Sequence, residues 1–395
     1  MKSIMPSFPD TPLAAKIAGQ IAGSSQLGRI ISNRRHEGRM VPSISFCSYM
    51  EACLYDEQYG YYQSGAVRVG KSGDFFTSSA IGTIMAEVIA RYAADFGREY
   101  GFPVTLAEWG AGTGKLSADI AAAFRNHRSA EEMTLRPLIV ENHPGHAAAA
   151  AESFRTFHRA GGGQPVVLSS VQFGEQYAKW MSDGSVLVLA NELLDAFPVH
   201  RIRRRGKRLV ELGVAVVPDE GFALTEMAVT DPRLADWLKR DGIFLREGQT
   251  TEICPGVRDW LFELSSRMPK GKVMIIDYGH DAEEYAAEHR MEGTLMTYWR
   301  HQASDSPLLG AGERDITAHV SFAFVKASAR EAGFEVVYYD TQKQFLVDYG
   351  VFELLRNHDG MDPFGEAARR NRAVRQLLLS DSMSESFKVM VLEKK

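Results

Sequence analysis

Short apolar runs alternate with amphipathic stretches through the chain from about residue 104 onward. Each run ends near a glycine, an asparagine or an acidic residue, and the runs occupy residues 104–109, 137–140, 165–168, 185–190 and 272–277. Mostly apolar runs of this length are typical of strands buried on both faces of a parallel sheet. Between the first four, stretches such as 116–124 and 147–157 have the period of a helix. The alternation predicts right-handed crossovers and a doubly wound α/β sheet.

Two later runs and two interruptions complete this pattern. Residues 334–339 and 387–392 predict further strands, and the second could pair antiparallel at or near the sheet edge. Residues about 200–250 contain two alternating runs joined by Gly206-Lys207, which predicts an inserted hairpin. Residues about 343–385 predict helices appended between the last two strands. Both interruptions would lie on the substrate side of one core.

The chain before residue 104 has a different pattern. It is mostly helical in period, with an aromatic and glycine-rich loop in its middle. Residues 13–35 are amphipathic and basic, which is also a property of mitochondrial transit peptides. A pair of amphipathic helices around Gly23-Ser24-Ser25 is the simpler interpretation. We therefore expect a cytoplasmic location.

Composition narrows the function classes without identifying the chemistry. Of the 395 residues 45% are hydrophobic and 24% charged, which excludes a mainly disordered, collagen-like or disulfide-scaffold protein. The net charge of −5 gives no pull toward nucleic acid or membrane, and no apolar run reaches about 18 residues. The three cysteines form no C-x-x-C pair, which disfavours a zinc site and fits a reducing compartment. We expect no metal, no nucleic acid and no membrane partner.

The strongest local signal is a glycine-rich turn between the first predicted strand and a helix. It reads Glu108-Trp109-Gly110-Ala111-Gly112-Thr113-Gly114, a G-x-G-x-G spacing that differs from the G-x-G-x-x-G of NAD-binding folds. Glycines allow a sharp turn and a close ligand, and the helix start offers N–H groups. The next strand ends in Glu141, where a carboxylate can accept both ribose hydroxyls of a nucleoside. This combination resembles the cofactor motifs of class I S-adenosylmethionine methyltransferases; an NAD or FAD site and a purely structural turn are the alternatives.

Polar residues also follow the fourth predicted strand. Asn191, Glu192 and Asp195 lie in the segment ANELLDAFP, and ligands of doubly wound sheets bind outside the carboxyl ends of strands. Two acids three residues apart could neutralise and orient a cationic nucleophile such as a guanidinium. The structural alternative is that Asn191 or Asp195 only caps a helix.

Seven motifs in a fixed order resemble the MidA family of S-adenosylmethionine-dependent methyltransferases. The resemblance spans about residues 12–393, and eukaryotic members include a mitochondrial enzyme that dimethylates an arginine of a complex I subunit during assembly. The motifs are Tyr59-Gly60-Tyr61-Tyr62, Gly73-Asp74-Phe75-Phe76-Thr77-Ser78, Glu108–Gly114, Asn191–Val199, Glu252-Ile253-Cys254-Pro255, Asp277-Tyr278-Gly279-His280 and Asp315–Val320.

The resemblance implies an α/β fold with a class I, Rossmann-like methyltransferase core. The core would span residues 104–395, with the insertion at about 200–250 and the appended helices at about 343–385. Residues 1–103 would form an N-terminal helical lid. The cofactor would be S-adenosyl-L-methionine, leaving S-adenosyl-L-homocysteine as product.

The resemblance also implies a role for each candidate residue. At the cofactor it implies four elements: the glycine turn braced by Glu108, a carboxylate that holds the ribose, the lid loop, and the residue after the fourth strand. Their residues are, in that order, Glu108 with Gly110, Gly112 and Gly114; Glu141; Gly73, Asp74 and Thr77; and Asn191. At the acceptor it implies Glu192 and Asp195, which would orient or deprotonate the nucleophile. His319, with His280, would lie at the same pocket, although a lone histidine is more often structural.

The chain departs from the family pattern at positions that bear on the acceptor. Ser79-Ala80 stand where Pro-Glu is usual, Ser321 where an acid is usual, and Ala111 where a proline is usual. A buried guanidinium requires paired carboxylates, whereas a neutral acceptor does not. We expect methylation of a protein arginine. The alternatives are a small-molecule O- or N-methyltransferase and a non-catalytic, S-adenosylmethionine-binding assembly factor, and a homodimer is compatible with all three.

Overall fold

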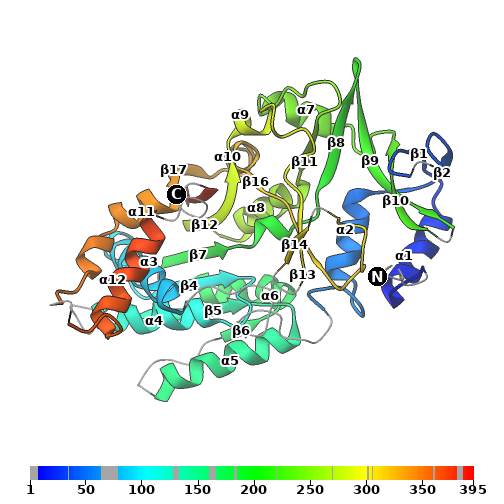
Figure 1. The fold of residues 1–395 in the computed structure, drawn as a ribbon. Helices are drawn as coiled ribbons and strands as arrows, with labels where there is room; N and C mark the ends of the chain where they lie inside the picture. The colour runs from blue at the N-terminus through cyan, green and yellow to red at the C-terminus, as the bar shows by residue number, and fades with distance from the viewer. Residues whose placement is uncertain are drawn as a thin grey trace. The chain divides into compact units, whose positions relative to one another are not determined.

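The computed structural model describes residues 8–33, 35–63, 79–127, 133–159, 166–181, 185–218, 220–268, 270–299, 302–304, 306–358, 361–379 and 386–395. The chain divides into two compact units, each built from three segments (Figure 1). The first unit comprises residues 1–66, 194–259 and 280–328, and the second comprises 67–193, 260–279 and 329–395. The boundary expected at residue 103 does not separate these units, because the first 66 residues share a unit with the expected insertion.

The second unit contains the predicted doubly wound sheet. Its strands lie in the order β17-β18-β12-β7-β4-β5-β6. Their bounds are β4 Val104–Trp109, β5 Leu135–Val140, β6 Val166–Leu168, β7 Ser185–Asn191, β12 Gly271–His280, β17 Glu335–Thr341 and β18 Phe387–Lys394. The five strands β12, β7, β4, β5 and β6 are parallel, while β18 is antiparallel to both β12 and β17. All seven predicted strands are thus confirmed, with the last one second from the edge.

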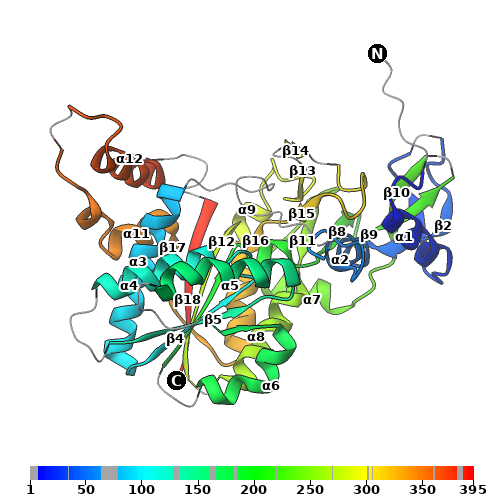
Figure 2. The same ribbon diagram turned by 90° about the horizontal axis from the view of Figure 1, so that it is seen from below.

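Helices cover both faces of this sheet because its strands are apolar on both sides. Val104 and Leu106 belong to a core with α3, α4, α11 and α12, and Figures 1 and 2 both show α11 and α12 beside α3. Trp109 packs against Phe173 of α6 and Trp260 of α8. The helices are α3 Ser79–Tyr100, α4 Lys115–His127, α5 Pro144–Arg159, α6 Ser170–Met181, α8 Pro255–Arg267, α11 Gln342–Asp348, η2 Val351–Leu354 and α12 Glu366–Leu379. The appended helices expected at about 343–385 are therefore present.

The first unit is built on an antiparallel sheet in the order β11-β8-β9-β10-β1-β2, with β3 paired to β9. The strands are β1 Leu27–Ile30, β2 Met40–Pro42, β3 Ile44–Ser45, β8 His200–Arg205, β9 Arg208–Val217, β10 Gly221–Met227 and β11 Thr250–Ile253. The predicted hairpin is confirmed, since Arg205 pairs with Arg208 across Gly206-Lys207.

The expected N-terminal helix pair is wrong in its second half. Helix α1 (Pro12–Ala22) is followed by strand β1, so the described part of residues 1–66 contains three strands besides α1 and α2 (Phe46–Tyr55). The reason lies in Gly28, where a Cβ would come within 2.4 Å of Thr225 Oγ1 on β10. Gly28 thus allows β1 to approach β10 closely, and Ile30 is buried there. Such long-range pairing overrides a helical period.

Smaller elements complete the first unit. They are η1 Leu194–Ala196, α7 Arg233–Arg240, α9 Ala282–Tyr285, β13 Met296–Trp299, β14 Gln302–Ser304, β15 Asp315–Thr317 and β16 Val320–Ser321, and α10 Phe322–Glu331 continues into the second unit. Helices α1 and α2 bury Leu13, Ile17, Phe46 and Tyr49 in the core of this unit. Among the helices of the described residues, none combines the length and the apolar character that a membrane crossing needs.

Candidate active site

Three neighbouring strands of the second unit end at the same level. Trp109 on β4 pairs with Val140 on β5 and with Ala190 on β7. Gly110, Glu141 and Asn191 each follow one of these residues, so they form a row across the carboxyl edge of the sheet. This edge is where doubly wound sheets bind their ligands.

The glycine turn opens this edge. Gly110, Gly112 and Gly114 all have positive φ, at 64°, 53° and 65°. A Cβ on Gly110 would lie 2.7 Å from Leu193 Cδ1, and one on Gly114 would lie 2.8 Å from Ala150 Cβ. The turn therefore needs glycine both for its backbone and for its close neighbours. It leads directly into the N-terminus of α4, whose N–H groups favour a negatively charged ligand group.

Glu108, which precedes the glycine turn, stabilises the start of α4. Its buried carboxylate accepts hydrogen bonds from the backbone N–H and the hydroxyl of Ser117. Burial raises the pKa of Glu108 to about 7, although the bonds from Ser117 lower it in part. These contacts support a bracing role for Glu108.

Glu141 is arranged to receive further donors. One carboxylate oxygen accepts the N–H of Gly112 and the other accepts the N–H of His143, each at 2.9 Å. Burial raises the pKa of Glu141, while these backbone donors lower it in part. The backbone N–H of Asn142 is a further donor to this carboxylate. A carboxylate has about four acceptor sites, so one is left for a ribose hydroxyl. Glu141 also ties the glycine turn to β5.

Glu192 has an unusual backbone. Its φ is 49°, and among the residues that the structure describes it is the single non-glycine residue with positive φ. Its N–H donates to the carbonyl of Ile276 at 2.8 Å, which fixes it against β12. Such a conformation costs roughly 1–3 kcal/mol and tends to occur at functional sites. Asn191 Nδ2 lies 3.5 Å from Glu192 Oε1, so these two predicted residues are side by side.

The first unit contains a cluster of carboxylates and tyrosines. Asp195, in η1, is buried, and its backbone carbonyl accepts the N–H of Ala318 at 2.9 Å. Asp315, also buried, accepts the hydroxyl of Tyr62 on both carboxylate oxygens, at 2.9 and 3.0 Å. Burial raises the pKa of Tyr298, and the charges of Asp195 and Asp315 raise it further. Tyr298 therefore lies near both carboxyl groups.

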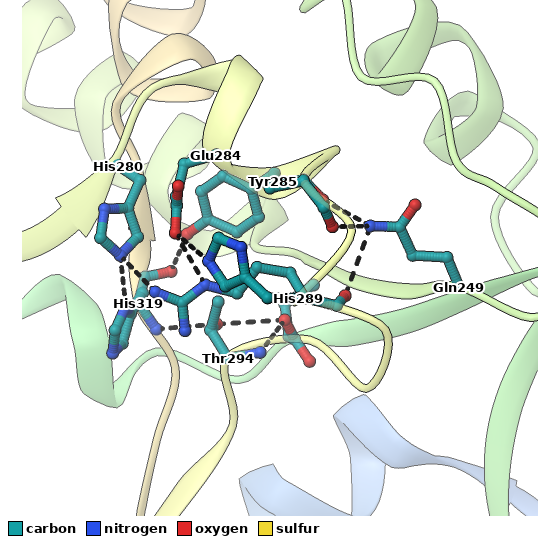
Figure 3. A network of polar contacts seen from close by, with 10 residues as sticks. Gln249, His280, Glu284, Tyr285, His289, Thr294 and His319 are labelled. Carbon is teal, nitrogen blue, oxygen red and sulfur yellow. Dashed lines mark hydrogen bonds and ion pairs between the residues drawn. The ribbon is translucent and has the colours of Figure 1, made fainter.

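His319 belongs to the same unit and is held by a polar network (Figure 3). Its Nδ1 lies 2.9 Å from His280 Nε2, and an Arg290 nitrogen lies 3.1 Å from that same Nε2. A guanidinium can only donate, so His280 Nε2 is the acceptor and His319 Nδ1 must be its second donor. The backbone of His319 is fixed as well, because its N–H donates to Thr294 and its carbonyl accepts the Tyr285 hydroxyl.

This network leaves His319 neutral, with the lone pair of its ring on Nε2. Burial lowers the pKa of His319 to about 4, and the neighbouring His280 and Arg290 lower it further. His319 lines a small cavity of about 20 Å³ together with Leu194 and Glu252. It is therefore a hydrogen-bond acceptor at neutral pH and a weak base.

The structure brings the predicted residues together in two groups. Glu108, the three glycines, Glu141, Asn191 and Glu192 gather at one edge in the second unit, whereas Asp195 and His319 lie near each other in the first. Gly73, Asp74 and Thr77 lie outside the described residues. Sequence reasoning did not select Tyr62, Tyr298 or Asp315 as site residues. Tyr62 and Asp315 both lie in motifs that the sequence analysis names, and their place in those motifs was the signal that could have identified them.

Comparisons with known proteins identify related methyltransferases. A family described as "Putative S-adenosyl-L-methionine-dependent methyltransferase" matches residues 88–339. The crystal structure of a "likely methyl transferase" from Burkholderia thailandensis, bound to S-adenosyl-homocysteine, is similar with a TM-score of 0.80 and 27% sequence identity. The similarity covers 97% of this chain and 92% of that chain.

Curated relatives share a more specific name. The mouse protein arginine methyltransferase NDUFAF7, mitochondrial, is 26% identical over 330 residues, which are 78% of this chain and 71% of the relative. The zebrafish (Danio rerio) protein of the same name is 26% identical over 331 residues, 78% of this chain and 73% of the relative. Because these relatives are named mitochondrial, the expected cytoplasmic location is wrong. The expectation rested on interpreting the amphipathic, basic residues 13–35 as a plain helix pair, and the cysteine content does not distinguish one reducing compartment from another.

Proposed function

This chain belongs to the family of S-adenosyl-L-methionine-dependent methyltransferases that matches residues 88–339, and from this premise we propose that it methylates a protein arginine side chain. The observation that carries the proposal is that two buried acids, Asp195 and Asp315, both lie near Tyr298, and that Tyr62 donates to Asp315. The names of the curated relatives support the same acceptor.

The cofactor fits the carboxyl edge of the second unit. The turn of Gly110, Gly112 and Gly114 would hold the methionine part, and Glu141 would accept a ribose hydroxyl through its remaining acceptor site. When bound, S-adenosyl-L-methionine supplies an electrophilic methyl group on a sulfonium. Glu108 would act indirectly, by fixing the start of α4 through its hydrogen bond with Ser117.

The proposed acceptor site is complementary in charge to a guanidinium. A guanidinium is planar and always positive, and it binds best where two carboxylates can receive its forked donors. Asp195 and Asp315 supply such a pair in a buried place, with Tyr62 fixing both oxygens of Asp315. The acids missing at Ala80 and Ser321 are therefore not needed to neutralise the substrate.

Glu192 is the candidate for moving the proton. A guanidinium nitrogen that gains a methyl group must lose a proton, and a nearby carboxylate can accept it. The positive φ of Glu192 and its bond to Ile276 hold this residue in one place at the sheet edge. His319 would accept a hydrogen bond from the acceptor through Nε2. These residues would otherwise act by alignment and by excluding water.

A neutral small molecule is the second candidate acceptor. Ser321 lines the same small cavity as His319, and a hydroxyl there suits a neutral ligand better than a cation. An assembly factor without catalysis would need the cofactor site without needing Glu192.

The test uses Glu192→Gln in the full chain, with Asp236→Asn on the exposed face of α7 as a matched carboxylate-to-amide control. Cofactor binding is measured by calorimetry and methyl transfer by label from S-adenosylmethionine into protein fractions of a lysate. We expect Glu192→Gln to keep cofactor binding within about threefold and to lose about 10²-fold or more of methyl transfer. The Asp236 variant should behave as the wild type. Label in small molecules alone contradicts the arginine acceptor, and an unchanged rate in Glu192→Gln contradicts the role of Glu192.

A further inference from the structure

Glu252 is a buried acidic residue of the first unit to which the proposed function assigns no role. It lies in β11 and begins the motif Glu252-Ile253-Cys254-Pro255. Its side chain is 2% exposed, and it lines the same small cavity as His319. Burying a carboxyl group is costly unless its oxygens receive hydrogen bonds. The donors that Glu252 receives therefore indicate which part of the unit it holds in place.

One oxygen of Glu252 binds the neighbouring strand. Arg201 lies directly opposite on β8, and its Nε donates to Glu252 Oε1 at 3.2 Å. The same guanidinium donates through Nη2 to the backbone carbonyl of Glu292 at 2.7 Å. Arg201 is buried as well. It therefore joins Glu252 to the loop of residues 291–294, which precedes β13.

The other oxygen of Glu252 binds Thr294 in this loop. Glu252 Oε2 accepts the N–H of Thr294 at 2.9 Å and its hydroxyl at 3.1 Å. Gly293 allows this close approach, because its φ is 83° and a Cβ there would lie 2.2 Å from Glu252 Oε1. The N–H of Thr250 on β11 also donates to the carbonyl of Met291 at 2.8 Å. The loop is therefore fixed against both β8 and β11.

Thr294 transmits this constraint to His319. Its hydroxyl donates to Glu252, and the oxygen of that hydroxyl accepts the backbone N–H of His319 at 3.1 Å (Figure 3). A hydroxyl can do both at once, since it has one donor hydrogen and two lone pairs. The Tyr285 hydroxyl donates to the carbonyl of His319. The position of His319 therefore depends on the hydrogen bonds that Glu252 and Thr294 make behind it.

We propose that Glu252 and Thr294 are positioning residues for methyl transfer, which hold His319 where its ring meets the methyl acceptor. The inference rests on the proposed function, because that function places His319 at the acceptor. Neither positioning residue has to touch the substrate. A misplacement of about 1 Å that originates far from the chemistry can lower a rate about 10²-fold. A purely structural role would instead leave the effect of Thr294 independent of the His319 ring.

The experiment is a double-mutant cycle in the full chain, with Thr294→Val and His319→Gln made singly and together. Valine has the shape of threonine without the hydroxyl, so it removes the bonds to Glu252 Oε2 and to the N–H of His319. The rate measured is transfer of label from saturating S-adenosylmethionine into the lysate fraction that the wild type labels. We expect Thr294→Val to lower this rate about tenfold in the wild type and less than about twofold in His319→Gln. The Kd for S-adenosylmethionine should change less than about twofold.

Two further variants and one spectroscopic readout accompany the cycle. Thr294→Ser keeps the hydroxyl and should retain the rate within about threefold. Thr225→Val is the matched control, because Thr225 is another buried threonine of the first unit and its hydroxyl pairs with Ser43 Oγ at 3.3 Å. It should transfer methyl groups as the wild type does. Hydrogen exchange at the His319 amide, followed by NMR, should be at least about tenfold faster in Thr294→Val than in the wild type.

Three results would overturn the proposal. The first is an unchanged rate in Thr294→Val, and the second is an equal loss with and without the His319 ring. The third needs no variant and decides the matter if Thr294→Val fails to fold: a wild-type His319 amide that exchanges as fast as an unprotected one. Failure of the arginine acceptor is recognised separately, because label then appears only in small molecules, and the cycle is evaluated with that fraction.

Discussion

The cofactor edge of the second unit and the carboxylate cluster of the first unit are built in different ways. The cofactor edge uses short contiguous segments, each placed by the end of one strand in a parallel sheet. The carboxylate cluster joins Tyr62, Asp195, Tyr298 and Asp315, which are separated by up to 253 positions in sequence. The proposed site of a cofactor common to many enzymes is thus a local motif, whereas the residues proposed to select the acceptor come from distant segments.

The largest effect on the cofactor edge is expected from a substitution of Gly110. In Gly110→Val the new side chain would strain a backbone with φ of 64° and displace Leu193, so we expect cofactor affinity to fall at least about 100-fold. Calorimetry with S-adenosylmethionine measures this loss. Gly19→Ala is the control, because a Cβ there has open space. A variant that binds the cofactor normally, with an unchanged circular dichroism spectrum, would contradict the role of the turn.

A substitution in the carboxylate cluster of the first unit should have the opposite effect: it should lower activity on the acceptor and leave cofactor affinity unchanged. Removing the charge of Asp315 in Asp315→Asn leaves a buried tyrosine hydroxyl facing an amide, and a lost charged hydrogen bond costs about 1.5–3 kcal/mol. We expect kcat/KM for an arginine-containing protein to fall about 10–100-fold, with cofactor affinity unchanged. Steady-state kinetics and calorimetry on the same sample test both parts. Equal losses in both measurements would mean a general loss of structure.

Glu141 offers a milder change at the cofactor edge. Glu141→Gln keeps the shape but replaces one acceptor oxygen by a donor nitrogen, which cannot receive a ribose hydroxyl and a backbone N–H. We expect the Kd for S-adenosylmethionine to rise about tenfold and kcat at saturating cofactor to stay near the wild-type value. A fall in kcat without a change in Kd would place Glu141 at the acceptor instead.

The smallest effect concerns two histidines, the buried His146 of the second unit and the half-buried His319 of the first. Burial lowers the pKa of His146 and of His319 to about 4, below the value of an unfolded histidine. Unfolding therefore takes up protons as the pH falls from about 6.5 to 4, so each histidine removes stability over this range. Glu108 works in the opposite direction, because its raised pKa favours the folded state as the pH falls below 7.

The difference between variant and wild type isolates one histidine from this balance. We expect His146→Gln to lose less unfolding free energy than the wild type between pH 7.5 and pH 5.5, by about 1 kcal/mol. Urea denaturation at the two pH values measures it. Parallel losses in variant and wild type would show that His146 does not titrate with a lowered pKa.

The parts of the fold that the sequence predicted are those set by local pattern. The run at residues 104–109 is strand β4 at the same bounds, since an apolar run flanked by a loop and a glycine turn has few other structures. The segment around Gly28 was misjudged because its partner, Thr225, lies almost two hundred residues away. Non-local strand pairing leaves little trace in a single segment.

The candidate site residues show the same difference between features set by local pattern and features set by long-range contacts. Gly110, Glu141 and Asn191 were predictable because each directly follows a strand, and strand ends in a parallel sheet meet at one edge. Asp315 was not selected as a site residue, because its partnership with Tyr62 and Asp195 depends on how three segments of the first unit fold together. The positive φ of Glu192 likewise has no signature in the sequence, since it depends on the bond to Ile276.

The interleaving of the first unit has a consequence for grafting activities between homologues. Strand β10, from residues 194–259, pairs with β1 from the N-terminal segment, and Asp315 on β15, from the third segment, accepts the hydroxyl of Tyr62 in the N-terminal segment. A chimaera that exchanges one of these segments alone would bring together strands or side chains that were never selected to match. Transfer of acceptor preference from one member of the family to another therefore requires all three segments to move together, leaving the cofactor edge of the recipient untouched.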